Sequence, residues 1–244
     1  MIRFIIVAMT VILFLILSIP ILIAEYLIGR KHPEVRDRHS RAIIRSMFRF
    51  IIWETGSKVT VHGLENIPKD QAVLYVGNHR SYFDILVGYS NVIGLTGFVA
   101  KKEMEKIPLL STWMFRIHCL FLDRENMREG LKTILEGIEK VKAGISIWIF
   151  PEGTRHSDSH DMLPFHEGSM KIADKSGCPV IPVAISGTAE IFEQHFPKIR
   201  PSHVVITFGQ PIYLKDLTKE QKKASGAYTR GVIAQMLEKQ GKDR

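Results

Sequence analysis

The chain contains 244 residues, of which 45% are hydrophobic and 24% are charged, and its 33 Lys and Arg against 25 Asp and Glu give a formal net charge of +8. This composition is typical of a folded protein with a basic surplus, and it excludes a disordered chain, a collagen-like repeat and a bare coiled coil. The only two cysteines, Cys119 and Cys178, exclude a disulfide framework and favour a reducing location that faces the cytoplasm. The length predicts one domain with an additional segment.

The additional segment lies at the start of the chain, where residues 4–24 carry no charged side chain. A helix over this run is about 32 Å long, which matches a hydrocarbon core of about 30 Å. A secretory signal peptide fits less well, because its apolar region is shorter and Glu25-Tyr26-Leu27 follows this run instead of a cleavage site. We therefore expect residues 1–30 to anchor the protein in a membrane. Pro20 permits a kink, so a hairpin that dips into one leaflet is the alternative to a full span.

A basic segment follows the apolar run. Its surplus of Lys and Arg places everything after residue 30 on the cytoplasmic side of a cell membrane. Arg41, Arg45 and Arg49 repeat every four residues along a predicted helix from Arg41 to Trp53. We interpret residues 31–57 as a basic amphipathic helix at the bilayer interface, with the arginines among anionic headgroups. A helix that docks on the core with a solvated arginine face is the alternative. No nucleic-acid partner is expected, because the chain has no aromatic-basic RNA motif, zinc-finger spacing or basic zipper.

Residues 58–244 change to short β-rich runs that alternate with helical stretches, which predicts an α/β domain with a mixed, largely parallel sheet and flanking helices. A helix that begins after Asn126, with Glu129 completing a capping box, lies between two of the runs. The expected strands are residues 58–62, 72–76, 95–99, 119–122, 145–150, 180–185 and 204–208.

Chemically active side chains follow three of these strands. His79 and Asp84 come after the strand at 72–76, Arg124 comes after 119–122, and Glu152 to Arg155 come after 145–150. Ligands of α/β sheets collect at the carboxyl ends of the strands, so we expect these side chains to share one site. The combination of a histidine, carboxylates and arginines suits proton transfer beside an anionic group.

The spacing of His79 and Asp84 is the sharpest of these signals. If Ser81 caps the next helix, Asp84 lies in its first turn and can reach back to the imidazole, which fixes the tautomer and leaves the other ring nitrogen free as a base. Asp84 could instead only complete a capping box with Ser81, and His79 could be incidental.

The remaining signals allow two interpretations each. Arg124 and Arg155 suit an anion, because a guanidinium matches phosphate oxygens bidentately, but Arg124 could have no special role. Glu152 and Arg155 could form an ion pair that braces a glycine turn. No metal site is expected, because the chain has neither His-Glu-x-x-His nor paired cysteine spacing.

Two blocks give the sequence a family resemblance. The segment from Asn78 to Asp84 resembles the His-x4-Asp block of the glycerolipid acyltransferases, and Phe150-Pro151-Glu152-Gly153-Thr154-Arg155 matches their Phe-Pro-Glu-Gly-Thr-Arg block letter for letter. Weaker similarity covers Phe121 to Arg124 and Val180 to Val183. The chain departs from the family at His118, where the family has glycine.

The resemblance implies transfer of a fatty acyl group from acyl-CoA or acyl carrier protein to the sn-2 hydroxyl of lysophosphatidic acid, which makes phosphatidic acid for phospholipid biosynthesis. His79 is then the base and Asp84 orients it. The resemblance implies that Arg155 binds the acceptor's phosphate with Arg124 and with Lys101 or Lys102. Glu152 and Thr154 then position the glycerol or Arg155, and Gly153 belongs to the same substrate-binding loop. No cofactor is implied, and the partners are the phospholipid bilayer, the acceptor and the acyl donor.

Three alternatives remain open at this stage. Another lysophospholipid or glycerol-3-phosphate could be the acceptor. A lipid hydrolase would use water instead, although the chain lacks the Gly-x-Ser-x-Gly elbow of many hydrolases. A membrane-bound scaffold with a dead site is disfavoured by the intact set of His79, Asp84, Glu152 and Arg155. The acyl-chain preference, the donor carrier and the oligomeric state are not encoded in any pattern that we recognise.

Overall fold

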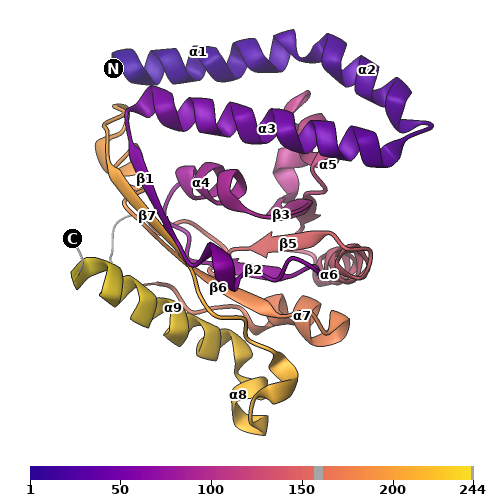
Figure 1. Cartoon of the computed structure of the whole chain (residues 1–244), viewed down its shortest axis with the longest axis vertical. Coiled ribbons are helices and arrows are strands. Elements are labelled where there is room, and N and C mark those ends of the chain that lie inside the picture. The colour runs from indigo at the N-terminus through magenta and orange to yellow at the C-terminus, as the bar shows by residue number, and fades with distance from the viewer. Residues whose placement is uncertain (157–161, 243–244) are drawn as a thin grey trace.

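The computed structural model describes residues 1–156 and 162–242 and contains one seven-stranded sheet (Figure 1). The strand order is β1-β7-β6-β2-β5-β3-β4, and every neighbouring pair is parallel except β6 and β7. All seven predicted strands are confirmed, with ends that differ by at most two residues. They are β1 (Lys58–His62), β2 (Leu74–Gly77), β3 (Thr96–Lys101), β4 (Leu120–Leu122), β5 (Ser146–Ile149), β6 (Val180–Ser186) and β7 (His203–Phe208).

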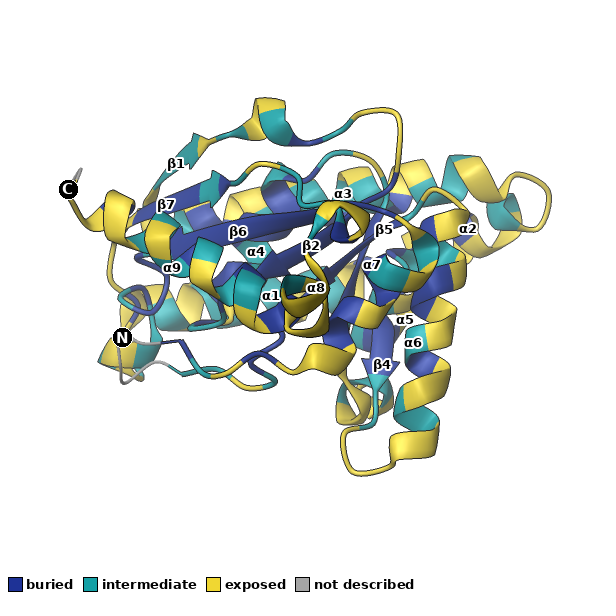
Figure 2. Ribbon diagram, turned by 90° about the horizontal axis from the view of Figure 1, so that it is seen from below, coloured by how far each residue is buried: buried dark blue, intermediate teal, exposed yellow. Residues whose placement is uncertain are grey.

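The central strands are covered on both faces, as Figure 2 shows by their burial. Successive side chains of a strand point to opposite faces, so Leu74 and Val76 belong to one hydrophobic core and Tyr75 to the other. Tyr75 stacks on Trp148 with ring centroids 5.3 Å apart. A sheet that is buried in this way needs continuous apolar runs, which is why these strands read as Ala-Val-Leu-Tyr-Val and Ile-Ser-Ile-Trp-Ile-Phe.

Helices from different parts of the chain form the two outer layers (Figure 1). On one face lie α3 (Pro33–Thr55), α4 (Phe83–Asn91) and α5 (Leu110–Arg116). On the other lie α6 (Met127–Lys142), α7 (Lys171–Ser176), α8 (Lys219–Lys223) and α9 (Ser225–Lys242). Short 3-10 turns are η1 (Leu64–Asn66), η2 (Lys102–Lys106), η3 (Glu167–Met170), η4 (Glu193–His195) and η5 (Leu214–Asp216). The Asn126 side chain caps α6 as predicted, whereas Glu129 pairs with Lys132 at 2.6 Å instead of completing a capping box.

The apolar start of the chain is not one straight helix. It forms α1 (Ile2–Leu17) and α2 (Ile19–Gly29), which are bent by 45° at Ser18, next to Pro20. No single helix among the described residues is long and apolar enough to cross a membrane, and only the bent pair together meets that test by length and composition. The predicted kink near Pro20 is confirmed, and the expectation of one helix over residues 4–24 is wrong.

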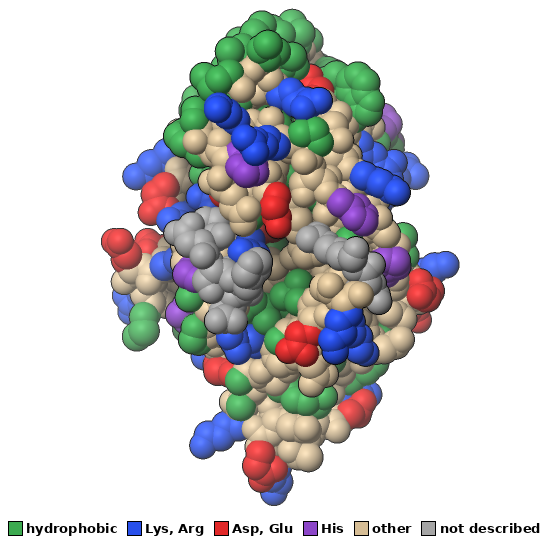
Figure 3. Space-filling model, turned by 90° about the vertical axis from the view of Figure 1, so that its left-hand side faces the viewer, with side chains coloured by type: hydrophobic (Ala, Val, Ile, Leu, Met, Phe, Trp, Pro, Cys, Tyr) green, Lys and Arg blue, Asp and Glu red, His purple; other side chains and the backbone are tan. Residues whose placement is uncertain are grey.

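One side of the α1–α2 pair packs on the protein and the other is exposed. Phe14 of α1 packs its ring against Trp113, whose indole N–H donates to the Ser18 hydroxyl at 2.9 Å. Glu25 of α2 is buried and accepts a hydrogen bond of 2.7 Å from Ser40 of α3. Figure 3 shows apolar side chains gathered at this end of the molecule. The exposed ones include Ile2, Ile5, Ile6, Met9, Ile12, Leu13, Ile16, Leu17, Ile19, Ile21, Ile23 and Leu27.

Three arginines of α3 donate hydrogen bonds to the body of the protein. Arg41 donates to the carbonyl of Val92 at 3.2 Å, and Arg45 and Arg49 donate to the carbonyl of Ser90 at 2.9 and 3.4 Å. These carbonyls end α4, where a helix concentrates unpaired acceptors and partial negative charge. The prediction that the three arginines lie among headgroups is therefore wrong. The alternative of a helix docked on the core is correct in position, but its arginines are bound and not merely solvated.

Candidate active site

The predicted site residues follow the carboxyl ends of neighbouring strands. β2 leads to His79, β5 leads to Glu152, and β4 leads to Arg124. Because β2 pairs with β5 in parallel, the two loops emerge at the same edge of the sheet. Asn78 holds the first loop to β6, since its side chain donates to the carbonyl of Ile185 at 2.9 Å and accepts from the amide of Ile185 at 2.8 Å. The expected convergence at one edge is confirmed for these loops.

His79 and Asp84 are in direct contact. Nδ1 of His79 lies 2.9 Å from Oδ2 of Asp84, which is in the first turn of α4. A carboxylate can only accept, so the proton of this bond belongs to Nδ1, and in the neutral ring Nε2 carries none. The ring of His79 also stacks on Phe150, with centroids 4.1 Å apart and planes 12° apart. The imidazole is thus fixed in orientation and tautomer, with 15% of its side chain exposed.

The carboxylate of Asp84 is fully buried and accepts three further hydrogen bonds. Oδ2 accepts the amides of Arg80 and Ser81 at 2.7 and 2.8 Å, and Oδ1 accepts the hydroxyl of Thr188 at 2.6 Å. The bond to the Ser81 amide is the contact that a helix-capping role requires. Asp84 thus contacts His79 and also accepts the Ser81 amide, but the predicted capping box is not complete, because α4 has Tyr82 as its N-cap and no side-chain cap.

Glu152 joins the two loops of the site. Oε1 accepts the amide of His79 at 2.7 Å, and Oε2 accepts the amide of Leu163 at 2.9 Å. Burial raises the pKa of the Glu152 carboxyl above its ordinary value, and the two amide donors oppose that shift. Among the described residues no ion pair joins Glu152 to Arg155, so Glu152 braces the histidine loop and not the arginine.

The arginines of the site are held more loosely. The guanidinium of Arg155 lies 3.4 Å above the centroid of the Tyr82 ring, a cation–π contact. Arg124 donates from Nη1 to the carbonyl of Gly153, which joins the loop after β4 to the loop after β5. Gly153 has a φ of 74°, a conformation that favours glycine, and Thr154 beside it is exposed. Arg124 and Arg155 therefore flank one loop, as the sequence predicts.

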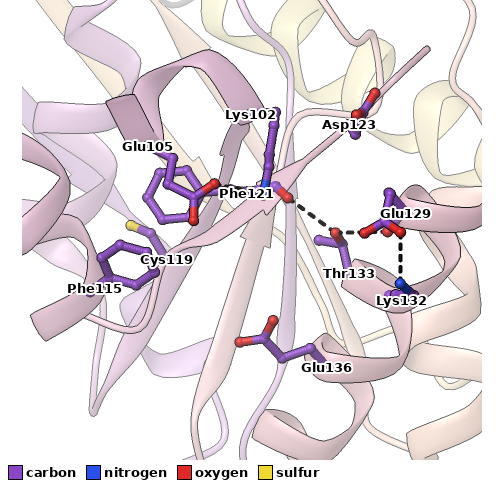
Figure 4. A pocket seen from close by; sticks show the side chains of 10 residues that line it. All are labelled: Lys102, Glu105, Phe115, Cys119, Phe121, Asp123, Glu129, Lys132, Thr133 and Glu136. Carbon is purple, nitrogen blue, oxygen red and sulfur yellow. Dashed lines mark hydrogen bonds and ion pairs between the residues drawn. The ribbon is translucent and has the colours of Figure 1, made fainter. Parts of the chain in front are cut away.

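The two predicted lysines lie apart from this cluster. Lys101 ends β3 and is exposed, and Lys102 pairs with Glu105 at 2.6 Å. Lys102 lines a separate cavity of about 180 Å³ along β4, together with Asp123 and Thr133 (Figure 4). No described contact connects either lysine to His79 or Arg155, so their role in binding phosphate stays a prediction.

His118, where the sequence departs from the family's glycine, has a φ of 61°. This left-handed backbone explains why glycine suits the position. Nε2 of His118 lies 3.0 Å from Oδ2 of Asp37 on α3. Burial lowers the pKa of His118, and Asp37 opposes that shift. His118 precedes β4, at the end of the strand opposite to Arg124.

Two residues that hold the segment from His79 to Asp84 were not predicted. Thr188 follows β6 and donates to Asp84, while Glu193 accepts from the Ser81 hydroxyl and the Tyr82 amide at 2.7 and 2.8 Å. β6 is parallel to β2, so the rule that selected the other strand ends also applies to Thr188. Glu193 lies in a 3-10 turn, for which the sequence carries no comparable signal.

The arrangement can move a proton beside a bound anion. His79 presents a free imidazole nitrogen backed by a buried carboxylate, and two guanidinium groups lie at the neighbouring loop. Within residues 1–156 and 162–242 there is no group of three or more His, Cys, Asp or Glu side chains that could hold a metal ion.

Known proteins of similar sequence are acyltransferases. The 1-acyl-sn-glycerol-3-phosphate acyltransferase of Saccharomyces cerevisiae is 32% identical over 186 residues, covering 75% of this chain and 60% of the relative. The corresponding enzyme of Borreliella burgdorferi is 32% identical over 155 residues, covering 64% of this chain and 62% of the relative. The match thus spans about three fifths of these relatives.

A solved structure agrees over nearly the whole chain. The crystal structure of the 1-acyl-sn-glycerophosphate (LPA) acyltransferase of Thermotoga maritima superposes with a TM-score of 0.85 at 26% identity, covering 98% of this chain and 95% of the other. Residues 58–186, more than half of the chain, match the acyltransferase family, and they contain both loops of the site. The chain belongs to the acyltransferase family.

Proposed function

We propose that the protein transfers a fatty acyl group from a thioester donor to the sn-2 hydroxyl of lysophosphatidic acid, which makes phosphatidic acid. The observation that carries the proposal is the contact of 2.9 Å between His79 and the buried carboxylate of Asp84, beside two loop arginines. The names of the relatives in yeast, Borreliella burgdorferi and Thermotoga maritima support lysophosphatidic acid as the acceptor.

The histidine and the aspartate divide the proton transfer between them. Nε2 of His79 takes the proton of the acceptor hydroxyl while the hydroxyl oxygen attacks the thioester carbonyl. The bond from carbonyl carbon to sulfur then breaks, and the leaving thiolate takes the proton from the imidazolium. Asp84 stabilises the imidazolium, and a positioned base of this kind contributes about 10² to 10⁴ in rate. No enzyme nucleophile is needed, because the acceptor supplies the attacking oxygen.

The developing oxyanion needs a donor that is not already occupied. The amides of Arg80 and Ser81 bond to Asp84, and the amide of Tyr82 bonds to Glu193. The start of α4 is therefore engaged in holding its own loop. In the loop after β5 the amide of Gly153 bonds to the carbonyl of Phe150, and the amide of His156 bonds to the carbonyl of His79. We therefore assign the oxyanion donor to the amides of Thr154 and Arg155, where the Arg155 side chain also meets the phosphate of the acceptor.

The exposed apolar surface of α1 and α2 favours a bilayer as the place of reaction. Their inner side chains pack on α3 and α5, so the outer ones are free to enter one leaflet. Both the acceptor and the product are lipids, and the thioester donor approaches from the cytoplasmic side. Ile12→Lys, at a side chain that is 57% exposed, should weaken flotation with anionic vesicles. Leu135→Lys on α6, 53% exposed, is the matched control and should float as the wild type does.

A matrix of donors and acceptors tests the reaction. Purified full-length protein is given labelled acyl-CoA or acyl carrier protein, with lysophosphatidic acid, a lysophospholipid of larger headgroup, glycerol-3-phosphate or no acceptor. We expect labelled phosphatidic acid with lysophosphatidic acid, and a loss of at least about a hundredfold in His79→Ala. The donor preference in the same matrix distinguishes CoA from the carrier protein.

Two outcomes of the matrix would contradict the proposal. Release of free fatty acid at the same rate without any acceptor would mean that water is the acceptor and the protein is a hydrolase. Wild-type turnover in His79→Ala would remove His79 from the mechanism. Product with glycerol-3-phosphate alone would keep the reaction type and change the acceptor.

A further inference from the structure

The chain that leaves β6 holds the catalytic loop from outside. We call residues 187–195 the brace. Thr188 donates to Oδ1 of Asp84 at 2.6 Å, and both residues are buried. Glu193 accepts from the Ser81 hydroxyl at 2.7 Å and the Tyr82 amide at 2.8 Å. The brace therefore contacts the loop between His79 and Asp84 through three hydrogen bonds, none of which involves His79 itself.

Thr188 bonds to the oxygen of Asp84 that does not face the histidine. Oδ2 receives three donors, from His79, Arg80 and Ser81, whereas the hydroxyl of Thr188 is the donor that the structure gives to Oδ1. Without that hydroxyl a buried carboxylate oxygen loses its partner, and the carboxylate can rotate toward other donors. The bond from Thr188 thus keeps the carboxylate plane aligned with the imidazole.

Glu193 connects the same loop to the arginine side of the site. Its carboxylate holds the amide of Tyr82, and the Tyr82 ring lies under the guanidinium of Arg155 at 3.4 Å. Burial raises the pKa of the Glu193 carboxyl, and the donors from Ser81 and Tyr82 oppose that shift. The half-buried carboxylate of Glu193 therefore orders this loop through the Ser81 hydroxyl and the Tyr82 amide.

We propose that Thr188 and Glu193 are positioning residues for the transfer reaction: Thr188 acts through Asp84 on the ring of His79, and Glu193 acts through Tyr82 on Arg155. The kinetic part of this inference rests on the proposed function. It predicts a division of effects, because orientation of the base changes kcat, whereas orientation of an anion-binding arginine changes the KM of the acceptor.

The first test replaces the hydroxyl of Thr188. Thr188→Val should lower kcat about tenfold with the acceptor KM unchanged, since a hydrogen bond to a charged group is lost. Thr188→Ser should restore at least about half of the wild-type kcat, because it returns the hydroxyl. Thr229→Val is the control, since Thr229 is also buried and its hydroxyl bonds within α9. Equal kcat in the Val and Ser variants would overturn the role of Thr188.

The second test asks whether Glu193 acts through Arg155. Glu193→Ala should raise the acceptor KM about tenfold, because the loss of one hydrogen bond to a charged group typically has an effect of this size. In an Arg155→Lys background the same change should have a clearly smaller effect, because the group that it positions is already altered. Glu190→Ala, in the same segment, is the matched control. Additive effects of Glu193→Ala and Arg155→Lys would overturn the connection.

A third measurement does not depend on activity. In ¹⁵N-histidine spectra of detergent-solubilised full-length protein, assigned with His79→Gln, wild-type His79 should carry its proton on Nδ1. Thr188→Val should raise the share of the Nε2–H form, and Thr188→Ser should not. If the wild type did not transfer acyl groups, the proposed function would be wrong, but the spectra would still test the role of the brace. An unchanged tautomer in folded Thr188→Val would mean that the inference is wrong. Should Thr188→Val not fold, Thr188→Ala takes its place in the spectra and in the kinetics.

Discussion

The two halves of the site are built differently. The proton-transfer half, centred on Asp84, is buried and every carboxylate oxygen has a donor on a neighbouring loop. The anion-binding half holds its arginines by the ring of Tyr82 and by one backbone carbonyl, at the exposed end of the β5 loop. In the reaction that we propose, the base acts on a single hydroxyl and benefits from a fixed geometry, whereas the headgroup must enter and leave. Damage to the first half should therefore reduce the rate of chemistry, and damage to the second half should weaken binding.

The largest expected effect is that of Asp84→Asn. An amide oxygen in the place of Oδ2 keeps the bonds from His79, Arg80 and Ser81, and the NH₂ group then faces the hydroxyl of Thr188. The amide carries no negative charge to stabilise the imidazolium, so turnover should fall at least about a hundredfold. Steady-state kinetics measure it, with the surface variant Asp174→Asn as the control. Turnover within a few-fold of the wild type would mean that Asp84 only caps α4.

Arg155→Lys should have the next largest effect and should leave kcat nearly unchanged. Lysine keeps the charge but loses both the bidentate fork and much of the stacking on Tyr82. We expect the acceptor KM to rise about tenfold, and the donor KM to change much less. Initial rates with each substrate varied in turn measure the two constants. An equal rise in both would indicate that Arg155 organises the loop and does not bind the phosphate.

Tyr82→Leu should act in the same direction with a smaller magnitude. Loss of a partly exposed cation–π contact removes about 0.5 to 1 kcal/mol, so the acceptor KM should rise by only a few-fold. Tyr82→Phe keeps the ring and is the control. If the Leu variant were impaired mainly in kcat, the ring would belong to the proton-transfer half, and the contrast between the halves would be weaker than we infer.

The smallest effect concerns stability and pH. Burial raises the pKa of Glu152 above its ordinary value of 4.5, so the folded state disfavours its ionised form. The protonated form of Glu152 therefore adds stability below pH 4.5, and this stability is lost as the pH rises through the raised pKa of the folded state. Glu152→Gln does not titrate, so its free energy of unfolding relative to the wild type should increase from acid to neutral pH. Urea unfolding at several pH values measures this difference. A difference that decreases with rising pH would contradict the direction of the shift.

Much of the buried half of the site was predictable from the sequence, because its residues are placed by short-range patterns. Strand ends collect ligands, and a spacing of five residues across a helix start brings His79 to Asp84. Applied to β6 as well, the same rule leads to Thr188. Glu193 was not predictable, since its partners Ser81 and Tyr82 are more than a hundred positions away in the sequence and no motif joins them.

The errors have one physical cause. Helical periodicity shows that Arg41, Arg45 and Arg49 share a face, but it does not show what that face meets. A membrane surface and the carbonyl end of α4 attract guanidinium groups for the same electrostatic reason. Similarly, the lack of charge in residues 4–24 shows that they are hydrophobic, but it does not show the bend of 45°, which Pro20 permits without requiring it.

The pairing of β1 with β7 bears on the order in which the chain folds during synthesis. β1 lies at an edge of the sheet with β7 as its neighbour, so β1 cannot pair until the chain has been synthesised beyond His203, the partner of Lys58. The His79 loop also needs Ile185, which holds Asn78. Such distant contacts form late and slowly. The apolar α1 and α2 are complete long before, so these two helices are made while the His79 loop is still unsupported.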